Sequence, residues 1–331
     1  MPKDIKTLSK DQLVSWLAER SIAPYRAEQI FKWIFLRQVD DFSIMTDLSQ
    51  RVRDLLTHHF SVARLEKLHI ASSEDGTRKY LFRLSDGKRI ESVLIPEKGH
   101  FTLCISTQVG CAQGCRFCRT ARGGFGRNLS VNEIVSQVRD IKNDMLDSDP
   151  LTNIVFMGMG EPLANYRNVL DALQTITDRK WGLQFSSRRV TISTAGLVPM
   201  FSALGLQTKV NLAVSLNATD NQTRSMLMPI NRKYPLEKLL GACRRYPLMP
   251  HRRITFEYIL IQGVNDSHAD SRRLAALLKP IRAKINLIPF NEFEGCEFRK
   301  PDKSVIADFQ ELLIKQHCIA IIRKSKGSDI A

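Results

Sequence analysis

Three cysteines in one short run have the spacing of a metal centre. Cys111, Cys115 and Cys118 are separated by three and then two residues, in the run Cys-Ala-Gln-Gly-Cys-Arg-Phe-Cys. Three thiolates on one tight loop can converge on a single cluster, and sulfur is the soft ligand that iron–sulfur centres need. A cluster of four irons held by three thiolates leaves one iron open to another ligand. The spacing therefore predicts an iron–sulfur centre that can bind a second molecule.

The alternative for these cysteines is a zinc site completed by a remote His or Cys. Zinc sites usually combine paired C-x2-C elements, and the sequence contains no second pair. A disulfide framework fits less well, because the chain has seven cysteines, an odd number, and the residues after Met1 lack a hydrophobic signal core. We therefore expect a cytoplasmic protein whose cysteines serve metal or redox chemistry.

The composition indicates a globular protein with a polyanionic partner. Of 331 residues, 43% are hydrophobic and 25% are charged, which excludes a disordered chain. Lys and Arg number 49 against 34 Asp and Glu, which gives a formal charge of +15. Clustered cations bind phosphates by releasing counterions, so we expect a polyanionic partner; the alternative is a basic protein that binds no nucleic acid. No apolar run of about 18 residues exists, so we expect no membrane segment.

Apolar runs and helical patterns alternate from about residue 101 onward. The expected strands lie near 101–106, 153–157, 189–193, 209–215, 254–260, 284–289 and 319–322. The expected helices lie near 131–145, 166–178, 235–245, 268–278 and 303–316. Ser130 and Glu133 form a capping box that marks one helix start. Repeated β–α units of this kind predict a parallel sheet, closed or partly closed into a barrel, with ligands at the carboxyl ends of the strands.

The residues before the barrel predict two smaller units. Apolar residues recur at helical spacing in the first sixty residues, as Leu13 and Leu17 illustrate. Alternating apolar residues around a Ser-Asp-Gly turn predict a β-hairpin over 78–96. The expected domains are an N-terminal helical accessory domain (1–75), a hairpin linker (76–100) and the barrel (101–331). The helical domain has basic residues between its apolar ones, a pattern that by itself is more typical of a packing module than of an RNA-binding domain.

The cysteine loop resembles that of the radical S-adenosylmethionine (SAM) superfamily. Phe117 precedes the last cysteine, and the loop follows the first barrel strand, as in that superfamily. The resemblance implies a [4Fe–4S] cluster whose open iron chelates the amino and carboxylate groups of SAM. It also implies that one electron cleaves SAM to methionine and a 5′-deoxyadenosyl radical, so that a donor such as flavodoxin or ferredoxin is needed. The implied fold is an α/β partial (β/α)6 barrel, here preceded by the helical domain and the hairpin.

Further motifs resemble the RlmN/Cfr family of RNA adenine methyltransferases, from about residue 10 to the last residue. They are Thr-Leu-Cys-Ile-Ser-Thr-Gln-Val-Gly-Cys at 102–111, Gly-Phe-Gly-Arg-Asn-Leu at 124–129, Met-Gly-Met-Gly-Glu-Pro-Leu at 157–163, Arg-Arg-Val-Thr-Ile-Ser-Thr at 188–194, Met-Pro-Ile-Asn at 228–231 and Lys-Ile-Asn-Leu-Ile-Pro-Phe-Asn at 284–291. Glu161-Pro162 is typical of the RlmN side, which methylates C2 of adenine, rather than of the Cfr side, which methylates C8. The resemblance implies a methyltransferase of 23S ribosomal RNA; transfer RNA as a further substrate and C8 as the target stay open.

The resemblance also implies a set of ligand contacts. The residues expected to contact SAM are Gly160, Glu161, Ser193, Ser215, Leu216, Asn217 and Asn291. At Asn217 the sequence departs from the family, which often has His there, but an amide can still donate and accept hydrogen bonds. Arg pairs such as Arg188-Arg189 and Arg252-Arg253 are each typical of a solvated face, but their number supports a surface that follows phosphates.

Two residues have no signal of their own and gain a role only from the resemblance. By itself Cys104 is typical of a small core residue and Glu91 of a solvated strand residue. In the family, Cys104 matches the thiol that resolves a protein–RNA covalent intermediate and ends in a disulfide bond. Glu91 matches the proton acceptor. These matches predict that both residues lie at the catalytic site.

The family's methyl-carrying cysteine follows a terminal segment similar to 323–331. The sequence ends at Ala331 without such a cysteine, and Cys318, Cys296 and Cys243 do not match its position. Two interpretations stay open. Either the sequence is a piece of a longer chain, or the protein is an RNA-binding relative that keeps the cluster and SAM without transferring a methyl group. We expect a monomer in either case.

Overall fold

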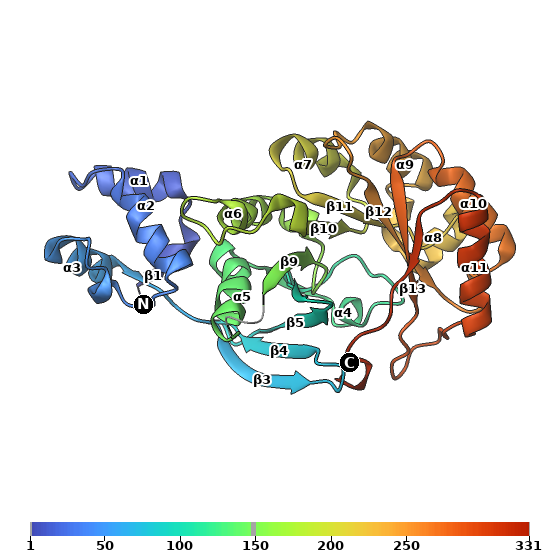
Figure 1. The fold of residues 1–331 in the computed structure, drawn as a ribbon, viewed down its shortest axis with the longest axis horizontal. Coiled ribbons are helices and arrows are strands. Elements are labelled where there is room, and N and C mark those ends of the chain that lie inside the picture. Colours follow the sequence, from blue (N-terminus) through green and yellow to red (C-terminus); the bar gives the residue numbers. More distant parts are fainter. Residues whose placement is uncertain (1, 147–149, 331) are drawn as a thin grey trace.

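Six parallel strands form the centre of the molecule, side by side in chain order (Figure 1). The structure is a computed structural model that describes residues 2–146 and 150–330. The strands are β6 (His100–Cys104), β9 (Leu151–Phe156), β10 (Val190–Thr194), β11 (Asn211–Ser215), β12 (Ile254–Leu260) and β13 (Ala283–Pro289), with β14 (Ala320–Ile322) at the edge. Every neighbouring pair runs parallel. The predicted α/β partial barrel is therefore confirmed.

Helices connect these strands and lie outside the sheet (Figure 1). They are α4 (Arg119–Arg122), α5 (Val131–Asn143), α6 (Tyr166–Thr177), α7 (Phe201–Gln207), α8 (Asn221–Leu227), α9 (Leu236–Arg245), α10 (His268–Leu278) and α11 (Lys303–Lys315). The predicted capping box of Ser130 and Glu133 is present at the start of α5. The five predicted helices of this region are found, whereas α4, α7 and α8 were not predicted. No helix among the described residues has the length and apolar character of a membrane span.

An antiparallel extension continues the sheet beyond β6. The predicted hairpin is present as β4 (Arg78–Arg83) and β5 (Arg89–Glu97), and a further strand, β3 (Glu66–Ser72), pairs with β4. Because β5 pairs with β6, these three strands and the barrel strands form one sheet of ten strands. The hairpin is thus joined to the barrel by backbone pairing of its residues Val93–Glu97 with β6.

The N-terminal helices form a unit whose apolar side chains join the hydrophobic core of the barrel, for example through the contact of Phe31 with Trp181. They are α1 (Lys10–Ala18), α2 (Arg26–Phe31), a π-helical turn (Lys32–Leu36) and α3 (Gln50–His59), and β1 (Lys3–Asp4) pairs with β2 (Phe60–Ser61). The apolar residues that predicted these helices are buried, among them Leu13 and Leu17, which are completely inaccessible to solvent. A Ser9–Gln12 capping box starts α1.

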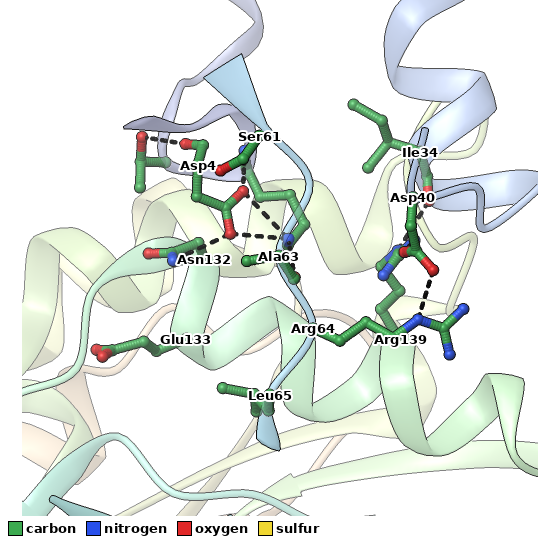
Figure 2. A network of polar contacts seen from close by, with 12 residues as sticks. Asp4, Ile34, Asp40, Ser61, Ala63, Arg64, Leu65, Asn132, Glu133 and Arg139 are labelled. Atoms are coloured by element: carbon green, nitrogen blue, oxygen red, sulfur yellow. Dashed lines mark hydrogen bonds and ion pairs between the residues drawn. The ribbon is translucent and has the colours of Figure 1, made fainter. Parts of the chain in front are cut away.

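A buried ion network attaches this unit to the barrel (Figure 2). Arg139 on α5 is 1% exposed, and its guanidinium donates to the Ile34 carbonyl at 3.0 Å and pairs with Asp40 at 2.5 Å. Lys6 is equally buried; it pairs with Asp4 at 2.8 Å and donates to the Ala63 carbonyl at 2.6 Å. Buried cations need such partners, because removing one leaves an uncompensated charge. The network therefore fixes the helical unit against α5.

Candidate active site

The three cysteines of the predicted cluster lie on one loop between two short strands. β7 (Gln108–Gly110) and β8 (Phe125–Asn128) pair antiparallel and close this loop. Gly110 has φ +72°, and a Cβ atom there would lie 2.0 Å from the Gly124 carbonyl oxygen. The same oxygen accepts from the Cys111 N–H at 2.8 Å. Only glycine satisfies this turn, so the sequence Gly110-Cys111 sets where the loop leaves the sheet.

The thiols of the loop interact with one another. Burial raises the pKa of the Cys115 thiol to about 12, and the charges of Cys118 and Cys111 act in the same direction. Burial also raises the pKa of Cys111, and Cys118 adds to the effect. Such thiols stay protonated at neutral pH until a metal displaces the protons. The apolar residues packed around Cys115 are Leu227, Met228, Ile230, Phe290, Cys296 and Phe298.

This donor set fits an iron–sulfur cluster. It consists of three soft thiolates on one loop in an apolar, water-poor environment. Among residues 2–146 and 150–330 no group of three His, Cys, Asp or Glu side chains is placed to hold a single ion. An iron–sulfur cluster does not require three side chains to converge on one ion, because each thiolate binds a different iron of the cluster. All seven cysteines of the structure are free.

The glycines after β9 are required by contacts within the protein. A Cβ atom on Gly158 would lie 2.7 Å from the Ser106 hydroxyl, and one on Gly160 would lie 2.5 Å from the Gln108 side chain. Glycines in such a loop can also allow a close approach of the backbone to a ligand. The structure gives a different physical reason, namely that this loop packs directly on the segment that leads into the cysteine loop.

Glu161 joins this loop to the end of β10. It is 2% exposed, and its carboxylate accepts from the Leu163 N–H at 2.9 Å and the Ala195 N–H at 2.7 Å. Burial raises the pKa of this carboxyl group. Its charge also raises the pKa values of Cys111 and Cys115, so it lies within electrostatic reach of the cysteine loop. The predicted SAM contact and the predicted cluster ligands are therefore neighbours.

Ser193 and Ser215 meet at a third residue that the sequence analysis missed. Glu257 on β12 is buried, and its Oε2 accepts from the Ser193 hydroxyl at 2.6 Å and from the Ser215 hydroxyl at 3.2 Å. Burial raises the pKa of Glu257. A signal was present in the sequence, since Glu257 is the one charged residue in the strand Ile254–Leu260. A lone charge in a buried strand needs hydrogen-bond partners, and these serines provide them.

Leu216 and Asn217 are completely buried at the end of β11. Asn217 has φ +57°, a conformation that Asn tolerates better than most residues. Its Oδ1 accepts from the Ile259 N–H at 2.9 Å, and its Nδ2 donates to the Met228 sulfur at 3.3 Å. The side chain at this position is therefore used in holding β11 against β12, and its carbonyl also accepts from Asn265.

Glu91 and Cys104 occupy the same face of neighbouring strands. Cys104 on β6 lies opposite Val93 on β5, and Glu91 is two residues before Val93, so their side chains point to one side of the sheet. Glu91 is exposed, whereas burial raises the pKa of Cys104 to about 12, with a further contribution from the charge of Glu257. Asn291 is exposed on the loop after β13, where its Oδ1 accepts from the Ser325 hydroxyl at 2.6 Å.

Arg224 on α8 is a second residue that the sequence analysis missed. It is 1% exposed, and it donates to the carbonyls of Leu216 at 3.0 Å and Ala195 at 2.9 Å. It forms no ion pair within the described part of the chain. Burial lowers its pKa to about 10, and the charge of Cys115 opposes the shift. A buried cation therefore lies close to the cysteine loop.

Comparisons with known proteins agree with this arrangement. Residues 105–275 match the model of the radical SAM superfamily, and residues 3–62 match the ribosomal RNA large subunit methyltransferase N-terminal domain. The chain is 57% identical to a dual-specificity RNA methyltransferase RlmN from Desulfosudis oleivorans, over 100% of this chain and 89% of that protein. It is 53% identical to the enzyme of the same name from Geobacter sulfurreducens, over 99% of this chain and 90% of that protein.

A solved structure gives the same result. The crystal structure of a radical SAM methyltransferase from Sphaerobacter thermophilus superimposes with a TM-score of 0.93 at 40% identity, covering 99% of this chain and 97% of that chain. The superfamily match confirms the expected [4Fe–4S] cluster and SAM as cofactors, and the zinc alternative is set aside. The predicted resemblance to the RlmN side of its family is also confirmed. The chain belongs to the RlmN family of radical SAM proteins.

Proposed function

We propose that the protein is a radical SAM methyltransferase that methylates C2 of an adenine in ribosomal RNA and in transfer RNA. One observation carries the proposal: the cysteine loop, Glu161 and the Ser193–Glu257–Ser215 group lie together in a chain that aligns along its whole length with RNA methyltransferases of the RlmN family. The excess of cations in the composition agrees with an RNA substrate.

In this proposal Cys111, Cys115 and Cys118 hold the cluster, and SAM binds between it and the ends of β10 and β11. When bound, the cluster and SAM would together supply one-electron chemistry that can remove a hydrogen atom from a methyl group. The protein contributes enclosure, because apolar side chains surround Cys115 and limit access of water. It also contributes orientation through fixed polar groups.

The serines act as acceptors. Each hydroxyl hydrogen is directed to Glu257, so the remaining lone pairs of Ser193 and Ser215 are available to a ligand donor such as a ribose hydroxyl. Glu161 keeps free lone pairs beside its two N–H partners, which suits an ammonium group. We include Gly160, Leu216, Asn217 and Asn291 in this SAM site as the residues that shape its walls.

Cys104 and Glu91 are the proposed catalytic residues on the RNA side. Because the pKa of Cys104 is raised, its thiol keeps its proton at neutral pH until a proton-accepting group removes it. Glu91 is exposed on the same face of the sheet, and its carboxylate lies 3.9 Å from the Lys79 ammonium; in this proposal it accepts the proton that the adenine loses. We place the RNA contacts of the N-terminal helical domain in residues 1–75, joined through 76–100 to the barrel in 101–331. An external electron donor, a monomeric state and a cytoplasmic location complete the proposal.

The test compares RNA from cells that make the protein with RNA from matched cells that do not. Nucleosides from both are separated and measured by mass spectrometry. We expect 2-methyladenosine only where the protein is present, and its loss when Cys118→Ala replaces the wild type. Equal 2-methyladenosine in both strains refutes the proposal, and 8-methyladenosine in its place indicates the Cfr reaction.

A further inference from the structure

A cavity of about 790 Å³ opens at the end of the barrel opposite the candidate active site. It is surrounded by the amino ends of the four strands β10 to β13, which are adjacent in the sheet (Figure 1). Its lining comes from the segments 187–191, 209–211 and 249–255 and from Lys284. The candidate active site uses the carboxyl ends of the same strands, so the two are separate.

The charge of this cavity is one-sided. Five lining residues are cations, namely Arg188, Lys209, Arg252, Arg253 and Lys284, and none is Asp or Glu. Within the described residues none of the five forms an ion pair, although seventeen ion pairs occur elsewhere. Surface cations that only aid solubility are usually interspersed with carboxylates. This group is instead concentrated and uncompensated.

The cations also repel one another. Burial lowers the pKa of Arg252, and the charge of Arg188 lowers it further. The Arg252 guanidinium is held by the Lys209 carbonyl, so it cannot move away freely. An anion placed among these groups would remove the repulsion and gain attraction at the same time. The cavity should therefore bind a multiply charged anion in preference to a neutral ligand.

The polar groups of the cavity suit phosphate. The strand alternation places Thr191, Asn211 and Thr255 on the barrel interior, where hydroxyl and amide donors accompany the cations. Guanidinium groups donate in pairs to phosphate oxygens, and the volume is that of a site for a small organic ligand or a few linked phosphates. The lining contains no Phe, Tyr or Trp on which a base could stack.

We propose that this basic cavity binds consecutive phosphates of the RNA backbone, as an anchoring site remote from the cysteine loop. The choice of RNA as the source of the phosphates rests on the proposed function. The lining has five cations against a single imidazole, that of His251, and this excess matches contacts that position a nucleic acid without recognising its bases. The Arg188-Arg189 and Arg252-Arg253 pairs, separate in sequence, each contribute to this one cavity.

The test uses a variant that removes two of the charges. Arg188→Gln and Lys284→Gln are combined, because neither side chain makes a hydrogen bond or ion pair with the described residues and both face the cavity. The matched control combines Lys238→Gln and Lys303→Gln, which removes the same charge from exposed positions on α9 and α11. Binding of unmodified transfer RNA is measured against salt concentration, and binding of inorganic tripolyphosphate is measured by calorimetry.

We expect the cavity variant to bind transfer RNA roughly tenfold more weakly at 0.15 M salt, with a slope of log affinity against log salt smaller by about 1.4–1.8. We expect it also to lose the tripolyphosphate binding seen in the wild type, while the control keeps both properties. Loss of tripolyphosphate binding with an unchanged RNA slope overturns RNA as the source and indicates a free polyphosphate ligand. No difference between variant and control in either assay overturns the site itself.

The same proteins separate this inference from the proposed function. Wild type that binds transfer RNA with the expected slope but leaves 2-methyladenosine unchanged in cells retains the cavity and refutes the methylation. Wild type that methylates RNA while the cavity variant binds it as the wild type does refutes the cavity and retains the methylation.

Discussion

Replacement of the buried Arg224 tests whether this cation holds the candidate active site together. Its guanidinium donates to the carbonyls of Leu216 at 3.0 Å, Ala195 at 2.9 Å and Ser215 at 3.1 Å, and to the Asn231 side chain at 3.0 Å. These partners belong to the ends of β10 and β11 and to the turn after α8. One side chain thus joins three segments that surround the cysteine loop.

Arg224→Met fills similar space but leaves these acceptors without a donor. An unpaired buried acceptor costs about 1–3 kcal/mol, and relaxation of the structure reduces the sum, so we expect the free energy of unfolding to fall by about 3–5 kcal/mol. The corresponding fall in Tm is about 4–7 °C, because the entropy of unfolding of a 331-residue chain is about 0.7 kcal/mol per degree. Arg224→Lys keeps the charge but reaches fewer acceptors, and we expect about half of this effect.

The assay is thermal and urea unfolding of the metal-free protein, followed by circular dichroism. Arg232→Met is the matched control, because Arg232 is exposed and forms no ion pair with the described residues. We expect the control to unfold like the wild type. If Arg224→Met lies within 1 kcal/mol of the wild type, the four hydrogen bonds do not carry the stability that we assign to them.

Three further changes test other parts of the argument. Gly110→Ala should lower the free energy of unfolding by about 2–3 kcal/mol and reduce iron uptake, because a Cβ atom would collide with the Gly124 carbonyl. Gly263→Ala is the control, because Gly263 has a similar φ of +68° but no atom within 4 Å of the added Cβ. Equal losses of stability in the two variants contradict the reasoning. Glu257→Gln should weaken SAM binding about tenfold in calorimetry, because it disturbs the hydrogen bonds that orient the two serine hydroxyls. The Tm should not fall, because the variant also removes a buried charge. Unchanged SAM binding contradicts the serine arrangement. Burial raises the pKa of the Cys243 thiol from 9.0 to about 12, so the stability that this thiol confers is complete below pH 9 and is lost as the pH rises to 12. Between pH 9 and 12 the free energy of unfolding of Cys243→Ala, measured in urea, should therefore fall less steeply with pH than that of the wild type, by about 1.4 kcal/mol per pH unit. Parallel curves of unfolding free energy against pH for the two proteins contradict the shift.

The parallel strands could be predicted because their signals are local. Each is a short, largely apolar run, and helix starts such as Ser130 carry their own capping partners. β3 could not be found in this way. Its residues Glu66–Ser72 are mostly exposed, and it lies at the sheet edge, so no buried face imposes an apolar alternation.

The candidate site was predictable where one motif contains the chemistry and not where distant segments meet. The cysteine spacing alone located the three thiols, and the structure brings them together on one loop. Glu257 and Arg224 were missed because their partners lie on other strands, up to 64 residues away in the case of Ser193 and Glu257. A single charge in an apolar segment indicates that partners exist, but the sheet register decides which residues they are.

Charged side chains that form no ion pair within the described residues give the two ends of the barrel opposite preferences. At the carboxyl end, Glu161 and Glu257 are buried without an ion pair among the described residues. An isolated buried carboxylate is unfavourable, and its raised pKa expresses that penalty, so a ligand with an ammonium or sulfonium group would be stabilised there. At the amino end, five cations without a carboxylate favour an anion. Strand β12 contributes to both ends with the same face. Thr255 lines the basic cavity, and Glu257, two residues and about 7 Å further along the strand, accepts from the serine hydroxyls. Two successive positions on one face of a single strand therefore belong to a site for a cationic ligand and to a site for phosphate.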